Sequence, residues 1–279
     1  THHNILFFTN KGKVYRQKGY EIPEAGRTAK GTAIINLLPI EQGEKITAVI
    51  PVKEFKDDHF MFMATNKGTV KKTNLVDFDS ARKTGLIAIN LDANEDLIGV
   101  EMTDGNSEIV IATRNGIAIR FDEQDVRPMG RTAAGVHGIK LNDGDEVISM
   151  QPQQKDHSVV IVTEKAYAKR IDSTQFKEFK TRNGKGQRAI KANKMTQTGK
   201  IISVMNGDSE EADLVLITDG GKVLRTPIAK IPVYSRTARG VRTMKLPDGA
   251  TVADAAQIDK AKEEDVALFD DELITNAHE

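Results

Sequence analysis

The sequence predicts an all-β fold made of five similar units, and three observations lead to this prediction. One short pattern recurs five times along the 279 residues, and a second pattern follows it at a nearly constant distance. Short segments of alternating apolar and polar residues, separated by turn residues, fill the rest of each unit. Several short strands repeated with a period of about 50 residues are typical of an array of small stacked β-sheets.

The first pattern predicts a β-hairpin at the start of each unit. In the first copy an apolar strand from Ile5 ends at Thr9, a tight turn contains Gly12, and a second strand ends at Arg16. A Gly between two such strands permits the tight turn of a hairpin. Ala166 replaces this Gly in the fourth copy, and the Thr recurs as Thr65, Thr113, Thr163 and Thr218.

The second pattern is a loop that begins with Arg and ends with Gly. It starts 17 to 19 residues after the Thr in every copy, and two patterns that keep phase over five copies establish a repeat. The loop occupies Arg27–Gly31, Arg82–Gly85, Arg131–Gly135, Arg182–Gly186 and Arg236–Gly240.

Two further short strands follow the loop in each unit. In the third copy the alternating run Val136–Leu141 leads through a turn at Asn142–Asp145 into the strand Glu146–Met150. Four strands per unit make a propeller blade, which cannot bury both faces alone and must stack on its neighbours. A β-helix has shorter coils, and a single sandwich does not explain a five-fold period. We therefore expect a propeller-like domain over residues 1–258, with repeats near 4–55, 59–104, 108–153, 158–208 and 213–258.

The composition excludes several classes of function. The chain has no Cys, which excludes disulfides, thiol catalysis and Cys-based zinc sites. It has no G-x-x-x-x-G-K-[ST] loop for ATP, and its six His residues do not cluster into a metal site. No apolar run is long enough to span a membrane, and no secretion signal opens the chain. We expect a cytoplasmic protein without catalytic residues, metal or cofactor.

The net charge of zero is the average of two unlike parts. Residues 259–279 contain eight acidic and two basic residues, which leaves 38 basic and 32 acidic residues in 1–258. A mildly basic body with an acidic tail indicates a polyanionic partner. The tail itself is interpreted either as a disordered solvating segment or as a mimic of the polyanion that competes for the basic body, and Val266, Phe269 and Leu273 have the spacing of a short docked helix.

The basic residues gather at one phase of the repeat, namely the end of the second strand and the Arg-to-Gly loop, whereas acids such as Glu41, Glu95 and Asp143 lie at the later turns. In a propeller, equivalent positions of successive blades lie at one height, so these bases predict a belt that binds the phosphates of a bent duplex. Solvated loops and a protein-binding propeller remain as alternatives. The predicted DNA-binding residues are Arg16, Arg27, Lys30, Lys72, Arg82, Lys83, Arg120, Arg131, Lys169, Arg170, Lys180, Arg182, Lys185, Arg225, Arg236 and Arg239.

These residues also carry a family resemblance. The stretches Asn4–Arg16, Lys18–Glu24, Gly26–Gly31, Ile35–Leu38 and Gly130–Val136 closely resemble the C-terminal domain of the A subunit of DNA gyrase, a type IIA topoisomerase. The resemblance implies a β-pinwheel of six blades that exchange strands and wrap DNA on a basic rim. It also implies a Q-R-R-G-G-K-G box in the first blade. That box is absent here, its nearest relative is Lys180–Gly186, and we expect a fragment with five of six blades.

The resemblance also implies partners. They are the other domains of the A subunit itself, duplex DNA and the ATPase B subunit of an A2B2 heterotetramer, which uses ATP and Mg²⁺ to introduce negative supercoils. The family's catalytic Tyr follows an Arg in an upstream domain, and none of Tyr15, Tyr20, Tyr167 and Tyr234 follows an Arg here. We expect the isolated fragment to be monomeric, and the whole enzyme to lie with the nucleoid in the bacterial cytoplasm. The alternative is the matching domain of topoisomerase IV.

Overall fold

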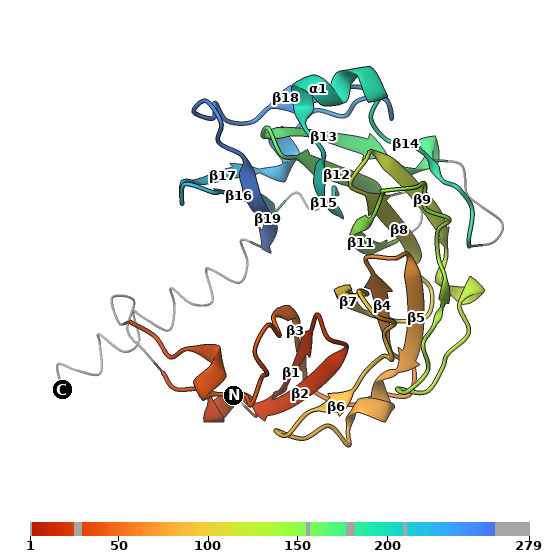
Figure 1. The fold of residues 1–279 in the computed structure, drawn as a ribbon, viewed down its shortest axis with the longest axis vertical. Coiled ribbons are helices and arrows are strands. Elements are labelled where there is room, and N and C mark those ends of the chain that lie inside the picture. Colours follow the sequence, from red (N-terminus) through yellow and green to blue (C-terminus); the bar gives the residue numbers. More distant parts are fainter. Residues whose placement is uncertain (1, 25–29, 155–156, 177–181, 209–210, 260–279) are drawn as a thin grey trace. The chain divides into compact units, whose positions relative to one another are not determined.

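The computed structural model describes residues 2–24, 30–154, 157–176, 182–208 and 211–259, and these residues form β-strands joined by turns (Figure 1). The chain divides into two compact units. Unit 1 comprises residues 1–111, 119–154 and 178–186, and unit 2 comprises residues 112–118, 155–177 and 187–279. The all-β prediction is confirmed, since α1 (Met195–Thr198) and a few 3-10 turns are the helical elements of the described part.

The strands follow the chain in five groups. They are β1 (Asn4–Thr9), β2 (Lys13–Lys18), β3 (Ile46–Val52), β4 (Phe60–Thr65), β5 (Thr69–Asn74), β6 (Leu86–Ile87), β7 (Leu97–Thr103), β8 (Glu108–Thr113), β9 (Ile117–Asp122), β10 (Val136–His137), β11 (Val147–Gln153), β12 (Ser158–Thr163), β13 (Tyr167–Asp172), β14 (Gln187–Arg188), β15 (Ile201–Asn206), β16 (Ala212–Thr218), β17 (Val223–Pro227), β18 (Val241–Arg242) and β19 (Val252–Asp259). The 3-10 turns span Gly19–Glu21, Ile34–Asn36, Leu75–Phe78, Glu123–Asp125, Ser173–Gln175, Ala192–Lys194 and Ile228–Lys230.

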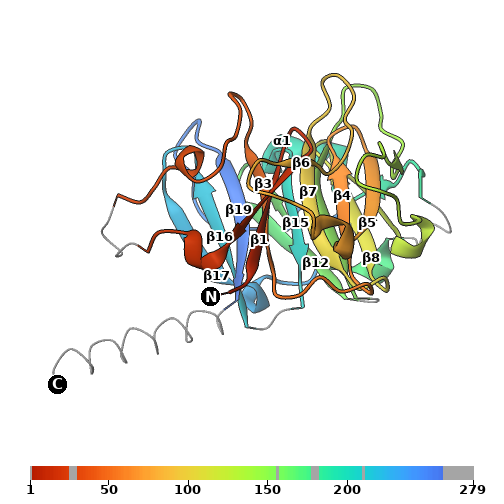
Figure 2. The ribbon, with the colours of Figure 1, turned by 90° about the horizontal axis from the view of Figure 1, so that it is seen from below.

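Each of the first four sheets contains the predicted hairpin, one long strand on its inner edge and a two-residue strand on its outer edge. The strand orders are β3-β1-β2-β6, β10-β5-β4-β7, β11-β8-β9-β14 and β15-β12-β13-β18. In every case the two-residue outer strand comes from the following repeat, so the strand exchange implied by the resemblance is present. Figure 2 shows β7, β4 and β5 of the second sheet side by side.

The fifth sheet differs from the other four. It has three strands in the order β17-β16-β19, one fewer than the predicted blade. Among the described residues no following repeat supplies an outer strand to β17, and the sheet therefore ends at this strand. The prediction of four strands needs this correction for the fifth sheet, and it holds for the first four.

The recurring Thr and Gly shape the hairpin turn. Gly12 has φ of +72° and donates its N–H to the carbonyl of Thr9 over 3.0 Å. The Thr side chain is buried in all five copies, and in the second copy the Thr65 hydroxyl accepts the N–H of Thr69 over 3.2 Å. Ala166 adopts φ of +59°, so the fourth copy keeps the left-handed turn without a Gly. Such a conformation costs an L-residue about 1–2 kcal/mol.

Each unit has its own apolar core. In unit 1, Leu6, Phe8, Met61 and Phe78 pack together with the strand residues around them. In unit 2, residues of β12, β13, β15 and β16 form a second cluster around Leu214. The first strands of the hairpins are buried at almost every position, as in all six residues of β8, so side chains on both faces of these strands are covered. None of the helices in the described ranges has the length and apolar character needed to cross a membrane.

The outer strand determines how much space surrounds the turn glycine of each hairpin. A Cβ at Gly12 would lie 2.5 Å from the carbonyl oxygen of Ile89, which follows β6, whereas a Cβ at Gly221 would meet nothing within 4 Å. Both glycines have a similar positive φ. We expect Gly221→Ala to lower the free energy of unfolding by about 1–2 kcal/mol, from backbone strain alone. Gly12→Ala adds the clash, and we expect a loss larger by a further ~1–3 kcal/mol.

Urea denaturation of the two variants and the wild type measures both losses. Gly43→Ala serves as a control, because Gly43 has φ of +82° and open space around its Cβ position. Equal losses for Gly12→Ala and Gly221→Ala would contradict the role assigned to the outer strand.

Candidate nucleic-acid interface

In unit 1, the Arg-to-Gly loops at residues 131–135 and 182–186 are each hydrogen-bonded to the segment that follows the preceding loop. We call residues 82–85, 131–135, 182–186 and 236–240 the rim loops. Asn90, which follows the first of them, donates its N–H to Ala133 over 3.3 Å and its amide to the carbonyl of Thr132 over 2.6 Å. Further on, Asn183 donates to the carbonyl of Gly138 over 2.7 Å. The loops of successive repeats in unit 1 therefore form one series, as the constant phase of the bases predicts.

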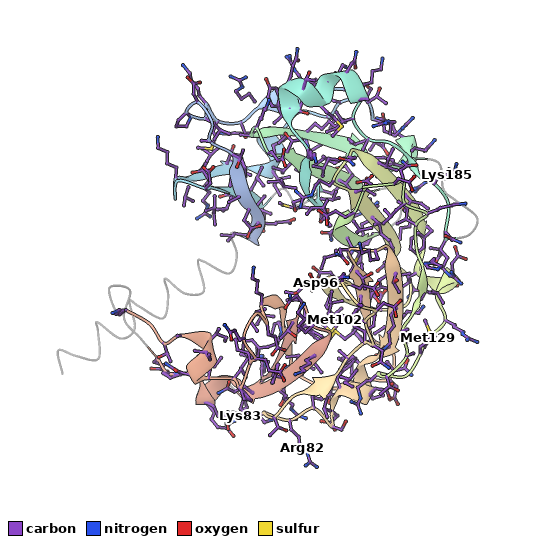
Figure 3. The ribbon with its side chains drawn as sticks, in the orientation of Figure 1. Arg82, Lys83, Asp96, Met102, Met129 and Lys185 are labelled. Carbon is purple, nitrogen blue, oxygen red and sulfur yellow. The ribbon has the colours of Figure 1, made fainter. Side chains whose placement is uncertain are left out.

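Three exposed bases of unit 1 lie on this series. Arg82, Lys83 and Lys185 are exposed, and Figure 3 shows them on the outer side of unit 1, with Asp96 and Met102 on its inner side. Lys83 lies 3.9 Å from a carboxylate oxygen of Glu21 and its side chain keeps 57% of its exposure. An exposed pair at this distance contributes little binding energy, so the ammonium remains available to a phosphate.

Unit 2 carries a rim loop of the same kind. Arg239 is exposed, lies over the Tyr167 ring with 5.4 Å between guanidinium carbon and ring centroid, and donates to Gln197 over 2.9 Å. A shallow pocket beside it is lined by Lys194, Gln197, Tyr234, Ala238, Arg239 and Gly240, and its lining contains two bases and no acid. Such a concave basic surface suits a phosphate group.

Several predicted bases are held by backbone carbonyls. Arg182 donates to the carbonyls of His137 over 2.9 Å and Asp125 over 3.3 Å. Arg170 donates to the carbonyl of Ile231 over 2.7 Å, and Arg236 to that of Arg188. Carbonyls fix the orientation of a guanidinium and leave its net charge uncompensated, so these half-buried residues still contribute positive potential to the surface.

Three predicted DNA-binding residues are corrected by the structure, because their side chains are buried. Lys72 is 4% exposed, Arg120 is 5% exposed and Lys169 is 1% exposed. Arg120 donates to both carboxylate oxygens of Glu108 over 2.9 Å. Lys72 donates to the carbonyl of Glu123 over 2.9 Å and lies over the Phe60 ring. These charges are directed into the protein rather than toward a partner.

The sequence contains a signal, not used in the prediction of DNA-binding residues, that identifies the bases paired inside the protein. The base at the end of the second strand meets the residue twelve positions before it, as in Arg16 with Asn4 and Arg120 with Glu108. The same spacing joins Arg225 to Asp213 over 2.6 Å. The spacing matches the length of the hairpin, which brings the start of its first strand beside the end of its second. A polar or acidic residue at this offset therefore indicates a structural base.

Two buried lysines support the rim loops from below. Lys169 donates to the carbonyls of Ala189, Arg236 and Ala238 over 2.6, 2.7 and 2.6 Å. Lys71 donates to the carbonyl of Ala88 over 2.6 Å and to that of Arg131. From the sequence, Lys169 was expected to bind DNA, and Lys71 was counted with the bases of the second repeat without a separate role. Because successive strand residues face opposite sides, Lys71 and Lys169 point toward the rim loops, and Lys72 and Arg170 lie on the other face of their strands.

Burial shifts the acid–base chemistry of these lysines. It lowers the pKa of Lys71 to about 8, with a further contribution from the charge of Arg131. It lowers the pKa of Lys169 to about 7, with smaller contributions from Lys194 and Arg236. In the first repeat Tyr15 takes the equivalent place, and burial together with its hydrogen bond to Glu44 raises the pKa of Tyr15 to about 12.

The remaining predicted residues divide as follows. Arg27 and Lys180 lie outside the described residues, Lys30 is exposed, and Arg131 is half-buried. Arg16 donates to the Asp79 carboxylate over 2.9 Å, so its charge is partly compensated.

Some acids of the later turns are also internal, since Glu44 accepts the Thr9 hydroxyl over 2.7 Å. Within the described ranges no three His, Asp or Glu side chains gather as metal ligands.

Comparison with known proteins gives a consistent result. A family model described as the DNA gyrase C-terminal domain, a β-propeller, matches residues 3–53, 59–104, 107–154, 157–206 and 212–259. A DNA gyrase A subunit from Haloquadratum walsbyi is 43% identical over 91% of this chain and 30% of its own length. One from Staphylococcus epidermidis is 40% identical over 93% of this chain and 29% of its own length. The chain thus spans less than a third of these relatives.

Two solved structures share the fold. A crystal structure of the C-terminal domain of DNA topoisomerase IV has a TM-score of 0.84 and 29% identity, and the match covers 96% of this chain and 83% of that one. A DNA gyrase A C-terminal domain has a TM-score of 0.77 and 24% identity, with coverage of 92% and 83%. The propeller fold expected from the sequence is confirmed by these likenesses.

The low pKa of Lys169 gives a prediction for stability. An unfolded Lys has a pKa near 10.4, so between about pH 7 and 10 the unfolded chain binds more protons than the folded one, and stability rises with pH. We expect the free energy of unfolding of the wild type, minus that of Lys169→Met, to increase across this range by at most about 1.4 kcal/mol per pH unit.

Denaturation of both proteins at several pH values measures this difference. Lys200→Met, at an exposed position of the same unit, is the control and should show no comparable trend. A difference between wild type and Lys169→Met that does not change with pH would show that burial does not lower the pKa of Lys169.

Proposed function

The chain belongs to the family of DNA gyrase C-terminal domains, and from this premise we propose that it binds duplex DNA along its rim loops and bends it, with little sequence preference. The observation that carries the proposal is the series of exposed bases on hydrogen-bonded loops, exemplified by Arg82, Lys83 and Lys185. Their charges face outward on a scaffold that fixes the spacing between successive loops.

The chemistry of the rim loops favours the DNA backbone as the ligand. Each Lys or Arg that neutralises a phosphate releases condensed counterions, and the gain accumulates along the path of the duplex. Glycines that end the rim loops, such as Gly135 at φ of +98°, let the loops pack closely on the preceding hairpin, since an added Cβ would lie 2.6 Å from the carbonyl oxygen of Val70. Aromatic residues make up 5% of the chain, which provides few platforms for stacking on bases. Binding through phosphates carries little sequence information.

In the longer protein we assign this domain to the A subunit of DNA gyrase. There the bent DNA is presented to the catalytic domains, and ATP hydrolysis with Mg²⁺ in the B subunit of an A2B2 assembly drives negative supercoiling. We assign no catalytic residue, metal or cofactor to this part of the chain. The enzyme would act on the nucleoid in the bacterial cytoplasm, and no membrane partner is proposed.

One specific observation supports a second candidate. The topoisomerase IV domain matches this chain with a TM-score of 0.84 at 29% identity. The two candidates share phosphate-based DNA binding and differ in topology, because the gyrase role requires that the DNA be wrapped with a fixed handedness. A measurement of linking number therefore distinguishes them.

The proposal predicts a salt-dependent affinity that depends on the rim loops. We expect Lys83→Ala with Lys185→Ala to weaken binding to a ~40 base-pair duplex by roughly 10- to 100-fold near 0.1 M salt, because each lost phosphate contact removes about 0.9 from the slope of log affinity against log salt. The loss should be similar for duplexes of unrelated sequence. Fluorescence anisotropy across a salt series measures both quantities.

The control removes the same charge elsewhere. Lys45 and Lys67 are exposed in unit 1 and lie outside the rim loops, Lys45 after the later turn of the first repeat and Lys67 in the hairpin turn of the second. Lys45→Ala with Lys67→Ala should leave the slope nearly unchanged. Equal effects of the two double variants would indicate a diffuse attraction without a rim, and a slope near zero in the wild type would favour a protein-binding propeller.

Bending and wrapping have a separate test. Nicked circular DNA ligated in the presence of the protein records any wrap as a change in linking number. We expect a shift toward positive linking number that grows with the amount of protein and is reduced by Lys83→Ala with Lys185→Ala. Tight binding without any shift would reject wrapping by this domain and favour the topoisomerase IV role.

A further inference from the structure

The Lys169 ammonium connects a rim loop to the sheet beneath it. It donates to the carbonyl of Ala189, the residue after the outer strand β14. It also donates to the carbonyls of Arg236 and Ala238 in the last rim loop. These three carbonyls match the three N–H groups of an ammonium, and the side chain is 1% exposed. One buried cation therefore fixes the position of this loop.

Lys71 makes the equivalent connection in unit 1. Its ammonium donates to the carbonyl of Ala88, the residue after β6, and to that of Arg131, the first residue of a rim loop. Lys71 and Lys169 both lie six residues after the recurring Thr, where the third repeat has the uncharged, buried Ile119. An apolar side chain can therefore occupy this place in the fold, and the ammonium groups are not required for a sheet to form.

The surroundings of the two ammonium groups do not favour a positive charge. The strand residues opposite them, Met63 and Ile161, are apolar and buried. The charged groups that act on them are mostly basic, namely Lys194 and Arg236 for Lys169, and Arg131 and Asp77 for Lys71. A buried charge in such a place costs free energy that an isoleucine does not. What the ammonium adds is its set of hydrogen bonds to the rim loop.

We propose that Lys71 and Lys169 are positioning residues for DNA, and that each ammonium holds its rim loop in the conformation in which the bases of the loop bind phosphates. The proposal rests on the DNA binding proposed above for the rim loops. In the last loop the carbonyls of Arg236 and Ala238 lie just before Arg239, which lines the basic pocket. When the ammonium is neutral or replaced, these carbonyls lose a charged donor, and the loop loses its fixed position.

Protonation of the two lysines makes this role measurable. A phosphate bound above the loop attracts the ammonium below it, so DNA favours the charged form and raises its pKa. In the free protein burial lowers the pKa to about 8 for Lys71 and to about 7 for Lys169. Below these values both groups are already charged, and binding needs no proton. Above them binding takes up protons, so the affinity for DNA falls as pH rises.

DNA affinity measured by fluorescence anisotropy between about pH 6 and 9 at constant ionic strength tests the proposal. The wild type is compared with Lys71→Met combined with Lys169→Met, because Met keeps an apolar stem and has no N–H donor. We expect the double variant to bind a ~40 base-pair duplex at least about threefold more weakly near pH 6. The affinity of the wild type should fall at least about threefold from pH 7 to 9, and that of the variant should fall less.

Other titrating groups do not disturb this comparison. On the outer strands His137 lies opposite Thr69, and Arg242 lies opposite Tyr167. Both are unchanged in the wild type and in the double variant, so their contributions cancel.

The third repeat provides a matched control. Ile119→Met places the same side chain at the same position of a repeat without removing an ammonium, and it should bind DNA like the wild type at every pH. Hydrogen exchange of the DNA-free protein gives a second readout. The N–H of Ala238, bonded to Ser235 over 2.9 Å, should exchange faster in Lys169→Met than in the wild type or in Ile119→Met.

Equal affinities of the wild type and the double variant near pH 6, or an equal pH dependence of the two, would overturn the proposal and leave DNA binding intact. A wild type whose binding does not depend on salt would instead contradict the proposed function. If the Met variants fail to fold, calorimetry of the wild type in HEPES and in Tris at about pH 8.5, where His is neutral, still decides. Net proton uptake on DNA binding is expected there, and its absence would reject the role of both lysines.

Discussion

The structure depends on a two-residue strand that each repeat gives to the sheet before it. A strand of two residues has little stability alone, and its backbone is held by hydrogen bonds such as those of β6 to β2. Ile89 anchors it by burying its side chain beside Gly12, where the close approach leaves no room for a Cβ. The rim loop comes immediately before this strand in the chain. The exchange therefore fixes the loop as well as the sheet, and it sets the bases of successive loops at one phase.

The support beneath the rim loops differs from repeat to repeat. In the first repeat the Tyr15 ring fills the space under Gly85, where a Cβ would lie 2.6 Å from the ring. In the second and fourth repeats the ammonium groups of Lys71 and Lys169 bind loop carbonyls instead. A buried ammonium is costly unless its N–H groups are satisfied, and the carbonyls of a loop supply acceptors without adding a counter-charge. Below their lowered pKa values, about 8 for Lys71 and about 7 for Lys169, these lysines add positive charge under the loop to the positive charge on it.

Much of the fold could be predicted from the sequence, because the same pattern of residues recurs in each repeat and marks the same strands and turns. The phase of Thr9 and its equivalents gave the hairpins, and Ala166 was placed correctly in a turn that usually needs Gly. The open edge of β17 was not predicted, because a two-residue strand such as β18 is too short to show alternation. The site was predicted less well. Base counts alone do not distinguish Arg120, paired with Glu108, from Lys185 on a loop, and the pairing becomes visible only when the twelve-residue hairpin offset is considered.

Because the buried bases do not belong to the proposed interface, fewer positive charges are available to offset the free energy of bending DNA. Among the described residues, the predicted bases that are exposed and for which no carboxylate lies within hydrogen-bonding distance are Lys30, Arg82, Lys83, Lys185 and Arg239, with Lys83 3.9 Å from Glu21. At about 0.1 M salt each phosphate contact contributes roughly 1.2 kcal/mol through counterion release, so five contacts supply about 6 kcal/mol. Bending a 20–30 base-pair site by 40–90° costs of order 1–6 kcal/mol.

For the strongest bend, the free energy gained by counterion release is nearly equal to the free energy of bending. The exposed bases alone would then bind a strongly curved duplex weakly. The half-buried guanidinium groups of Arg131, Arg182 and Arg236 therefore matter. Arg182 and Arg236 donate to carbonyls rather than to carboxylates, so their charge still reaches the surface while their positions are fixed. Pre-positioned charges lose little side-chain entropy on contact with a phosphate. More of the free energy of each contact is then left to offset the bending of the duplex.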